Sequence, residues 1–499
     1  MPPKTKSRVA PSTPAVKPEH PALAALKRSR WLYVLASVVL LAPCYWQPRV
    51  QAGDLSSHIY NAWLAQLIES GRIQGLQIVG QTTNILFDLM LGGLFKVLGP
   101  EAAQRICVSL SVLIFIWGAF VFAQAASGRK PWQILPCIAM LAYGWVFHMG
   151  FFNFYLSLGL CFWALALLWQ PSARRIGVAA PILVLAYVAH ALPVVWVLGL
   201  VAYMMVAGRL SAKSRAYLTA GSMLAMVILH AVIVGKMVSR WSANQITLTT
   251  GLDQTWVFDA KYYVVLIALL FVWAVLFLNL IHGSGARQVV STMPFQLCVL
   301  SAAAVFILPT SILFPGFHHA LVYIAERMSL GVGICFCALL SCARPGRFAR
   351  GAMVAIAVLF FAFLFHDERA LNSFEDRMQD TVASLPPGQR VISAIDAPNL
   401  RVNALAHMID RACVGRCYSY ANYEPSTAQF RVRAEAPNAY VASSYEDSWL
   451  MQVGMYVVKD RDLPLYQVDL DAEGRMVVKS LPAGAPCGST TWNVLGDLL

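Results

Sequence analysis

Long apolar runs with almost no charged residues recur through the first 366 residues of the chain. A run of about 18 such residues is long enough for a helix to cross the ~30 Å hydrocarbon layer of a bilayer. Of the 499 residues, 58% are hydrophobic and 13% are charged, whereas soluble proteins carry about 25% charged residues. The sequence therefore predicts an all-α, polytopic membrane bundle. The candidate spans lie at 31–48, 83–98, 103–126, 132–149, 151–169, 175–190, 191–208, 216–237, 261–281, 291–309, 327–343 and 351–366.

The net charge of +13 is spread unevenly along the chain. Residues 367–499 hold 17 of the 25 acidic residues and 12 of the 38 basic ones, so their net charge is −5, and residues 1–366 carry +18. Basic residues of membrane proteins gather in short cytoplasmic loops, where they fix the orientation of the spans. This split points to the lipid bilayer as a partner and argues against nucleic acid.

Composition divides the chain into three parts. Residues 1–30 are rich in Pro, Lys and Arg and predict a disordered cytoplasmic tail. Residues 31–366 hold the spans and an outer loop at 49–82, and the first run lacks a cleavage site and is expected to be a signal anchor. The basic loops direct the last span outward, which places residues 367–499 outside the cytoplasm. This orientation needs an odd number of spans, so 11 and 13 both stay open.

Residues 367–499 predict a small α/β domain on the outer side. A turn at Leu385–Gly388 ends the first helical pattern. The expected elements are helices at 367–384 and 401–411, strands at 390–395 and 441–443, and a hairpin of 465–470 with 475–479. His407 and Asp410 have helical spacing and are expected to be structural.

The domain at 367–499 also holds three of the 11 cysteines. Outside the cytoplasm, Cys413 could form a disulfide with Cys417, or either could pair with Cys487. The spacing of the three is not that of a zinc site. The other eight cysteines lie in or beside apolar spans and are expected to be small buried hydrophobic residues.

The outer loop 49–82 holds the most informative polar residues. Asp54 is one of only eight acids before residue 367. We expect it to cap a helix from Leu55 to Ser70, whose apolar stripe suits a helix lying flat at the membrane interface. Asp54 and His58 are four residues apart, can face the same way, and could form a general-base site. The alternative is a capping Asp54 and a solvated His58. The stripe consists of Leu55, Ile59, Trp63 and Leu67.

Three short motifs follow in a characteristic order: Leu-Gly-Pro-x-x-Ala-x-Arg at 98–105, Met-Gly-Phe-Phe-Asn-Phe-Tyr-Leu at 149–156, and Ala-Tyr-Val-Ala-His at 186–190. Together with the basic N-terminus, the first span and the acid before an amphipathic helix, this order resembles the GT-C superfamily of membrane glycosyltransferases. The closest likeness is to its bacterial branch of lipopolysaccharide-core and protein-mannosyl transferases. The resemblance covers roughly residues 31–210, and the later spans by architecture only.

The resemblance implies an inverting transfer of a sugar at the outer face of a bacterial inner membrane. In that family an acid of the first outer loop is the catalytic base, and Asp54 occupies this place. The base removes the proton of an acceptor hydroxyl, which attacks the anomeric carbon of a polyprenyl-phosphate sugar. Many members carry a second acid in this loop and a His-Pro-Pro motif before the second span. This chain has Glu69 fifteen residues on and Gln-Thr-Thr-Asn at 81–84, so the donor sugar and the use of a divalent metal stay open, and no cofactor is indicated.

A polyprenyl phosphate needs a cation at the outer boundary, and the planar fork of arginine suits phosphate. Arg327 begins a candidate span after a His-rich loop that contains His319. A charge at such a position is expensive and often functional, although pairing with Glu326 or snorkelling would also explain it. Lys261 and Arg240 flank the other large outer loop and are weaker candidates, for which interface anchoring is the more frequent role.

Two other residues and two other functions complete the analysis. Asn84 and Asp88 have i,i+4 spacing and could bond to a neighbouring helix or line a cavity. The alternative to a glycosyltransferase is a non-enzymatic exporter of lipid or polysaccharide, or an assembly scaffold; a ligase or polymerase of lipid-linked glycans is a related enzymatic option. Transporters carry ionisable residues at mid-membrane depth, whereas the rare acids here gather at the outer boundary. The acceptor, whether glycan, lipid or protein, is not specified.

Overall fold

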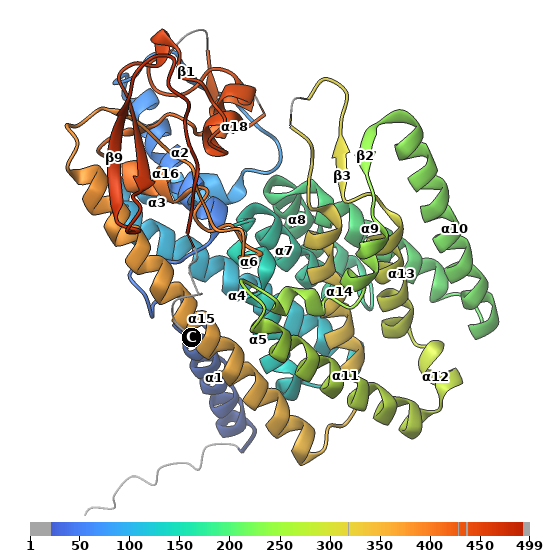
Figure 1. Ribbon diagram of the computed structural model, residues 1–499. Coiled ribbons are helices and arrows are strands. Elements are labelled where there is room, and N and C mark those ends of the chain that lie inside the picture. The colour runs from blue at the N-terminus through green and yellow to red at the C-terminus, as the bar shows by residue number, and fades with distance from the viewer. Residues whose placement is uncertain (1–20, 318, 428, 436–437, 493–499) are drawn as a thin grey trace, which may run out of the picture. The chain divides into compact units, whose positions relative to one another are not determined.

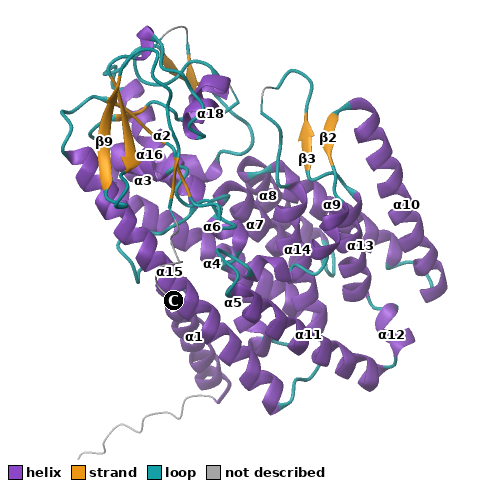
Figure 2. Cartoon of the chain, in the orientation of Figure 1, coloured by secondary structure: helices purple, strands orange, loops and turns teal. Residues whose placement is uncertain are grey.

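The computed structural model describes residues 21–317, 319–427, 429–435 and 438–492. It is mostly helical, at 64%, with several small sheets (Figures 1 and 2). Two compact units make up the chain, one ending at Ala42 and one starting at Pro43. The first contains α1 (Pro21–Leu40), so residues 21–30 of the predicted tail are helical rather than disordered. Residues 1–20 of that tail lie outside the described residues.

Four helices of the described chain are long and apolar enough to cross a membrane. They are α4 (Pro100–Ser127), α10 (Ala212–Lys236), α11 (Tyr262–Ser284) and α15 (Arg347–Ala383). Most of the other predicted spans also lie on one helix each: α3 (Leu86–Leu98), α7 (Phe152–Leu168), α8 (Ala173–Ala189), α9 (Ala191–Ala207), α13 (Met293–Ile307) and α14 (Ile324–Leu340). A short helix, α12 (Ala286–Val290), precedes α13. The number of crossings stays a prediction.

The predicted span at 132–149 is wrong as a single helix. It consists of a 3-10 turn, α5 (Leu135–Ala142) and α6 (Trp145–His148). The break has a physical cause, because the side chain of Gln254 accepts a hydrogen bond from the backbone N–H of Val146 at 3.1 Å. The loop that contains Gln254 thus supplies a hydrogen-bond acceptor in place of a backbone carbonyl of the helix.

Helices α4 and α7 pack with their backbones in close approach. A Cβ atom at Gly118 would lie 2.5 Å from the carbonyl oxygen of Gly159, and a Cβ at Gly159 would lie 2.8 Å from Cα of Phe115. Small residues allow such crossings in membrane helices. This contact holds the first half of the bundle together, and α7 also packs against α8 and α9.

The C-terminal region contains a four-stranded sheet in the order β6-β4-β8-β9. Strands β4 and β8 are parallel, and β8 forms the predicted antiparallel hairpin with β9. Residues 441–443 are not a strand, and the helix predicted at 401–411 is shorter. The predicted helix 367–384 is the end of α15, which runs unbroken across residue 366. The elements are β4 (Arg390–Ser393), α16 (Met408–Cys413), β6 (Tyr418–Ser419), α17 (Tyr423–Thr427), α18 (Tyr445–Gln452), β8 (Leu465–Leu470) and β9 (Met476–Leu481).

Cysteine pairing in this region is resolved. Cys413 and Cys417 form a disulfide, and Cys487 is a buried free thiol. Parallel pairing of β5 (Ile395–Asp396) with β10 (Thr490–Thr491) ties the end of the described chain to the region after β4.

The segment 49–82 and the C-terminal region pack against one another. Helix α2 (Gly53–Glu69) contacts α16 and α3, and β1 (Leu76–Ile78) pairs antiparallel with β7 (Val432–Ala434) (Figure 1). In the segments 238–260 and 310–326, β2 (Val238–Arg240) pairs with β3 (Ser311–Leu313) and is followed by two 3-10 helices, η3 (Ala243–Leu248) and η4 (Leu252–Thr255). These loops position the residues described next.

Candidate functional site

Helix α2 is enclosed by protein, contrary to the prediction that it lies flat at the membrane interface. Its stripe residues Leu55 and Ile59 are buried, and so are Tyr60 and Leu64 on other faces. The C-terminal region covers this helix, since the backbone N–H of Ser419 donates to the Tyr60 hydroxyl at 2.9 Å. The helix therefore places polar side chains inside the protein rather than at a lipid surface.

Asp54 lies in the first turn of α2 and is not the predicted N-cap. The N-cap is Ala52, and its side chain makes no capping hydrogen bond. The backbone N–H of Asp54 donates to the carbonyl of Met149 at 3.0 Å. Gly150 makes this contact possible: its φ is +83°, and a Cβ there would lie 2.5 Å from the Asp54 nitrogen. The motif at 149–156 thus fixes the start of α2, and Asp54 stays 25% exposed near the positive end of the helix dipole.

His407 is the nearest charged partner of Asp54. Its Nε2 lies 3.8 Å from Asp54 Oδ1, and its Nδ1 lies 3.2 Å from Asp410 Oδ2. Burial lowers the pKa of His407, but the hydrogen bond and the charge of Asp410, with a contribution from Asp54, raise it overall above its usual range. A protonated imidazole therefore lies beside the Asp54 carboxyl group. Asp410 also accepts a hydrogen bond from the Ser419 hydroxyl, so the imidazole is held in place.

Arg327 has hydrogen-bond donors without a partner among the described residues. Its guanidinium carbon lies 3.7 Å from the centroid of the Phe151 ring. The side chain is half-buried, and its Nε is buried without a partner. Burial disfavours its charge, and the largest attraction that opposes this comes from Asp54. The neighbouring Glu326 accepts a hydrogen bond from the Thr310 hydroxyl. A half-buried guanidinium without a partner is suited to an anion.

His319 joins this group, and Lys261 does not. The His319 ring stacks on Tyr423 with centroids 6.1 Å apart. Burial and then the charge of Arg327 lower the pKa of His319, so the imidazole is neutral beside the cation. Lys261 Nζ lies 2.5 Å from Asp367 Oδ1 and 3.2 Å from Asp259 Oδ2. Lys261 is therefore paired with these two acids, and no contact among the described residues joins it to Asp54.

His58 bonds to Asp88 rather than acting with Asp54. His58 Nδ1 lies 2.6 Å from Asp88 Oδ1, and the Asn153 amide donates to Asp88 Oδ2 at 2.7 Å. The shared helix face predicted for Asn84 and Asp88 is wrong, because α3 begins at Leu86 and Asn84 precedes it with a φ of +58°. Of the two predicted roles, Asp88 does bond to neighbouring helices through His58 and Asn153. Both Asn84 and Asp88 also line a cavity.

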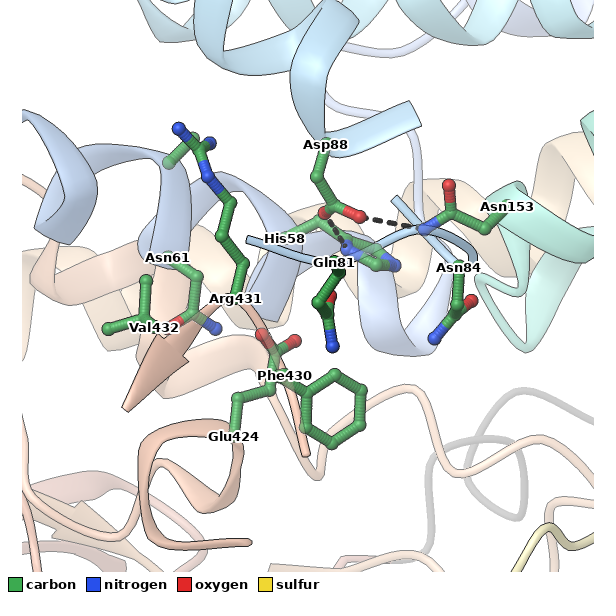
Figure 3. Close-up of a pocket in the computed structure, with 11 residues that line it drawn as sticks. His58, Asn61, Gln81, Asn84, Asp88, Asn153, Glu424, Phe430, Arg431 and Val432 are labelled. Atoms are coloured by element: carbon green, nitrogen blue, oxygen red, sulfur yellow. Dashed lines mark hydrogen bonds and ion pairs between the residues drawn. The ribbon is translucent and has the colours of Figure 1, made fainter. Parts of the chain in front are cut away.

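This cavity is polar and small (Figure 3). Its volume of about 20 Å³ suffices for one water-sized group. Asp88 bridges His58 and Asn153 on one side, and Glu424 of α17 lies on the other (Figure 3). The Ser57 hydroxyl donates to Glu424 at 3.1 Å. Burial raises the pKa of Glu424 to about 7, although His58 opposes this, so the carboxyl can hold or release a proton near neutral pH.

Histidine 58 should make stability depend on pH. Burial lowers its pKa, but the charge of Asp88 and its hydrogen bond raise the pKa to about 9, from 6.5. A raised pKa gives stability that is fully present below about pH 6.5 and is lost as pH rises through about 9. We expect the melting temperature of the wild type to fall more between pH 7 and 9.5 than that of His58→Asn. Equal slopes for the two proteins in a differential scanning experiment would contradict this.

The sequence does not predict what the C-terminal region contributes to the site. The helical spacing of His407 and Asp410 predicts only a structural role, and the polar and aromatic segment that holds Tyr423 and Glu424 predicts no function. Ser57 and Glu424 are 367 residues apart, and nothing local shows that they meet.

No preformed metal site is seen among the described residues, where no group of three or more His, Cys, Asp or Glu side chains could hold an ion. The candidate site consists of the Asp54 carboxylate, the half-buried Arg327, and two histidines, His319 in a loop and His407 just before α16. Comparison of the chain with protein-family models, curated proteins and solved structures gives no match.

Proposed function

We propose that the chain is a polytopic membrane glycosyltransferase of GT-C type, which transfers a sugar from a polyprenyl-phosphate donor to an acceptor hydroxyl. The observation that carries the proposal is that one short segment contacts both Asp54 and Arg327. The backbone N–H of Asp54 donates to Met149, and Arg327 lies over the ring of Phe151. One is a partly exposed carboxylate, and the other is a half-buried guanidinium without a partner among the described residues. A base next to an anion site is what this reaction requires.

The reaction would proceed in one displacement. Asp54 takes the proton of the acceptor hydroxyl, and the oxygen forms a bond to the anomeric carbon. The bond from that carbon to the phosphate oxygen breaks, and the polyprenyl phosphate leaves with the electron pair. Arg327 stabilises the negative charge that grows on the phosphate, and His407, 3.8 Å from Asp54, holds the base in position. The anomeric configuration inverts.

The placement of the site suits a lipid-borne donor. Arg327 lies in the first turn of α14 and Asp54 in the first turn of α2, at ends of helices rather than within apolar stretches. We place this end at the outer face of a bacterial inner membrane, with residues 367–499 as a periplasmic α/β domain. His407, Tyr423 and Glu424 would then be its contributions to acceptor binding.

The test is sugar transfer in proteoliposomes that contain the full chain. A panel of polyprenyl-phosphate sugars is supplied with membrane extracts as the acceptor source, and the anomeric configuration of the product is read by NMR. We expect one donor to be consumed with inversion. Movement of an intact lipid-linked sugar across the bilayer, with no bond broken, would instead support the exporter.

Arg327 variants should separate donor binding from the chemical step. Arg327→Gln removes the charge and is expected to raise KM for the donor about ten-fold or more, because a charged hydrogen bond contributes about 1.5–3 kcal/mol. Arg327→Lys keeps the charge but loses the planar fork of the guanidinium. Its KM for the donor should lie between that of the wild type and that of Arg327→Gln. The control is Arg350→Gln, which changes an exposed arginine at the start of α15. If Arg327→Gln and Arg350→Gln had the same KM, Arg327 would not bind the donor.

A further inference from the structure

A second and much larger cavity lies among the other outer loops. Its volume is about 790 Å³, within the ~300–1,000 Å³ range of small-molecule pockets. The 3-10 helices η3 and η4, the start of α11 and the segment from Thr310 to Glu326 form its walls. Neither Asp54 nor Arg327 lines it, and the reaction described above does not use its residues.

Three buried polar atoms of residues that line this cavity have no partner among the described residues. They are Oδ1 of Asp253 and the Nε1 atoms of Trp145 and Trp256. Asp253 is only 6% exposed, and its other oxygen accepts from the Ser329 hydroxyl at 3.0 Å. Leaving a buried polar group unpaired costs about 1–3 kcal/mol. One acceptor and two donors without partners in the wall of one cavity therefore indicate a ligand with hydroxyl groups.

The walls of the cavity are aromatic and rigid. Arg401 lies between two indole rings, 5.1 Å from the centroid of Trp145 and 4.9 Å from that of Trp256. Trp256 also packs on Tyr263 at 4.6 Å. Such rings offer flat apolar faces with polar edges. A sugar ring has the matching form, with apolar C–H faces and a rim of hydroxyl groups.

The lining charges are largely balanced, which favours a neutral ring. Arg401 pairs with Asp253 at 3.3 Å, and Glu326 is bonded by Thr310. Arg240 is exposed, so water screens its charge. The amide of Asn244 is exposed in η3 and also lines the cavity. It adds a donor and an acceptor without an internal hydrogen bond that would have to break.

The cavity adjoins the candidate site through Tyr323. This residue lines the cavity and packs on Trp145 at 5.6 Å and on Phe151 at 6.0 Å, the ring that carries Arg327. Its φ of +58° is rare for a bulky side chain. Its hydroxyl is influenced by the charges of both Asp54 and Arg327. A ligand in the cavity would therefore lie on the far side of Tyr323 from the proposed base.

We infer that this cavity binds a neutral, hydroxylated sugar ring, held by Asp253, Trp256 and Asn244. The inference rests on the proposed sugar transfer for its biological meaning, but not for its test. The ring belongs either to the lipid-linked donor or to an acceptor glycan, since both present the same chemistry.

The experiment is saturation-transfer NMR on the full chain in nanodiscs with a panel of methyl glycosides of hexoses, a pentose and an N-acetylhexosamine. We expect at least one glycoside to bind. Trp256→Phe keeps the ring face but removes the indole N–H, and Asn244→Ala removes the amide. Each should weaken binding about five-fold, the value of one hydrogen bond. The matched control is Ile246→Ala, an exposed residue of η3 outside the cavity.

The outcomes are distinct. Binding that is weakened in both lining variants and unchanged in Ile246→Ala supports the inference. Absence of binding for the whole panel, or equal binding in all four proteins, overturns it. An isoprenyl phosphate that carries the same sugar should displace the glycoside if the ring is the donor's, and should bind beside it if the ring is the acceptor's.

The proposed function is judged separately from this inference. Asp54→Asn should bind the glycoside like the wild type, because Asp54 does not line the cavity. If the wild type binds glycosides through Trp256 and Asn244 but transfers no sugar, the transferase proposal fails and the cavity stands. Transfer without such binding has the opposite meaning.

Discussion

Asp54→Asn is expected to reduce sugar transfer in proteoliposomes by about 10³-fold while the protein folds normally, because a positioned general base contributes about 10²–10⁴-fold. Asparagine keeps the size of the side chain but cannot accept the proton. The fold should tolerate the change, since the Asp54 side chain caps no helix end and its backbone bond to Met149 is retained. The change also removes the interaction with the helix dipole, about 0.3–1 kcal/mol, and the attraction of Asp54 for His407 and Arg327.

The matched control is Glu101→Gln. Glu101 is another exposed acid in the first turn of a helix, α4, so its loss repeats the change in charge and in helix dipole. We expect full transfer and an unchanged melting temperature. If Asp54→Asn were as active as Glu101→Gln, the base would have to be another group, and Glu424, with its pKa near 7, would be examined next.

The sequence could predict the helices of the bundle because a membrane span depends mostly on local composition. Where it failed, a distant segment had intervened. Residues 132–149 are apolar enough for one helix, but Gln254 bonds to the backbone of Val146 and the helix breaks. In the same way His58 has the right spacing to act with Asp54, but Asp88 offers a carboxylate at 2.6 Å.

The candidate site was predictable in part. Asp54 was predicted from its rarity among the acids, Arg327 from the start of an apolar run, and His319 from the His-rich loop before that run. The structure shows that His319 and His407 both pack on Tyr423 and that His407 pairs with Asp54. His407 lies far along the chain, just before a helix of only six residues. Its helical spacing with Asp410 predicted a structural role, so its contact with Asp54 becomes visible only once the C-terminal region is packed on α2.

The packing of the C-terminal region on α2 depends on a buried ion pair, and we expect a large loss of stability when this pair is broken. Arg411 of α16 donates to both oxygens of Glu375 in α15, from Nε at 2.7 Å and from a terminal nitrogen at 2.5 Å. It also donates to Gln104 at 2.8 Å and to the carbonyl of Val50 at 3.1 Å. The Arg411 side chain therefore links the C-terminal region to α15, to α4 and to the loop that precedes Asp54.

Arg411→Met should destabilise the protein by about 3–5 kcal/mol, because removal of one partner leaves a charge buried without adequate compensation. Glu375 has no exposed side-chain surface, and the partners that remain include Arg49 at 3.2 Å and the Gln51 amide at 2.7 Å. The measurement is the free energy of unfolding in urea, with hydrogen exchange of the amides in α16 and in the four-stranded sheet. The double variant Arg411→Met/Glu375→Met should recover most of the loss, since apolar replacement of a buried pair is often neutral or stabilising.

Arg475→Met tests whether burial is the cause. Arg475 pairs with Asp471 and Glu473 at the turn of the β8–β9 hairpin, but its side chain is 74% exposed. Water and salt already screen this pair, so its loss should change the unfolding free energy far less than the loss of Arg411. Two results would mean that the C-terminal region is held on α2 by its apolar contacts. One is an equal change in unfolding free energy for Arg411→Met and Arg475→Met, and the other is no recovery of that free energy in the double variant. In that case the position of His407 beside Asp54 would not depend on the ion pair, and Arg411→Met would retain transfer activity in the folded fraction.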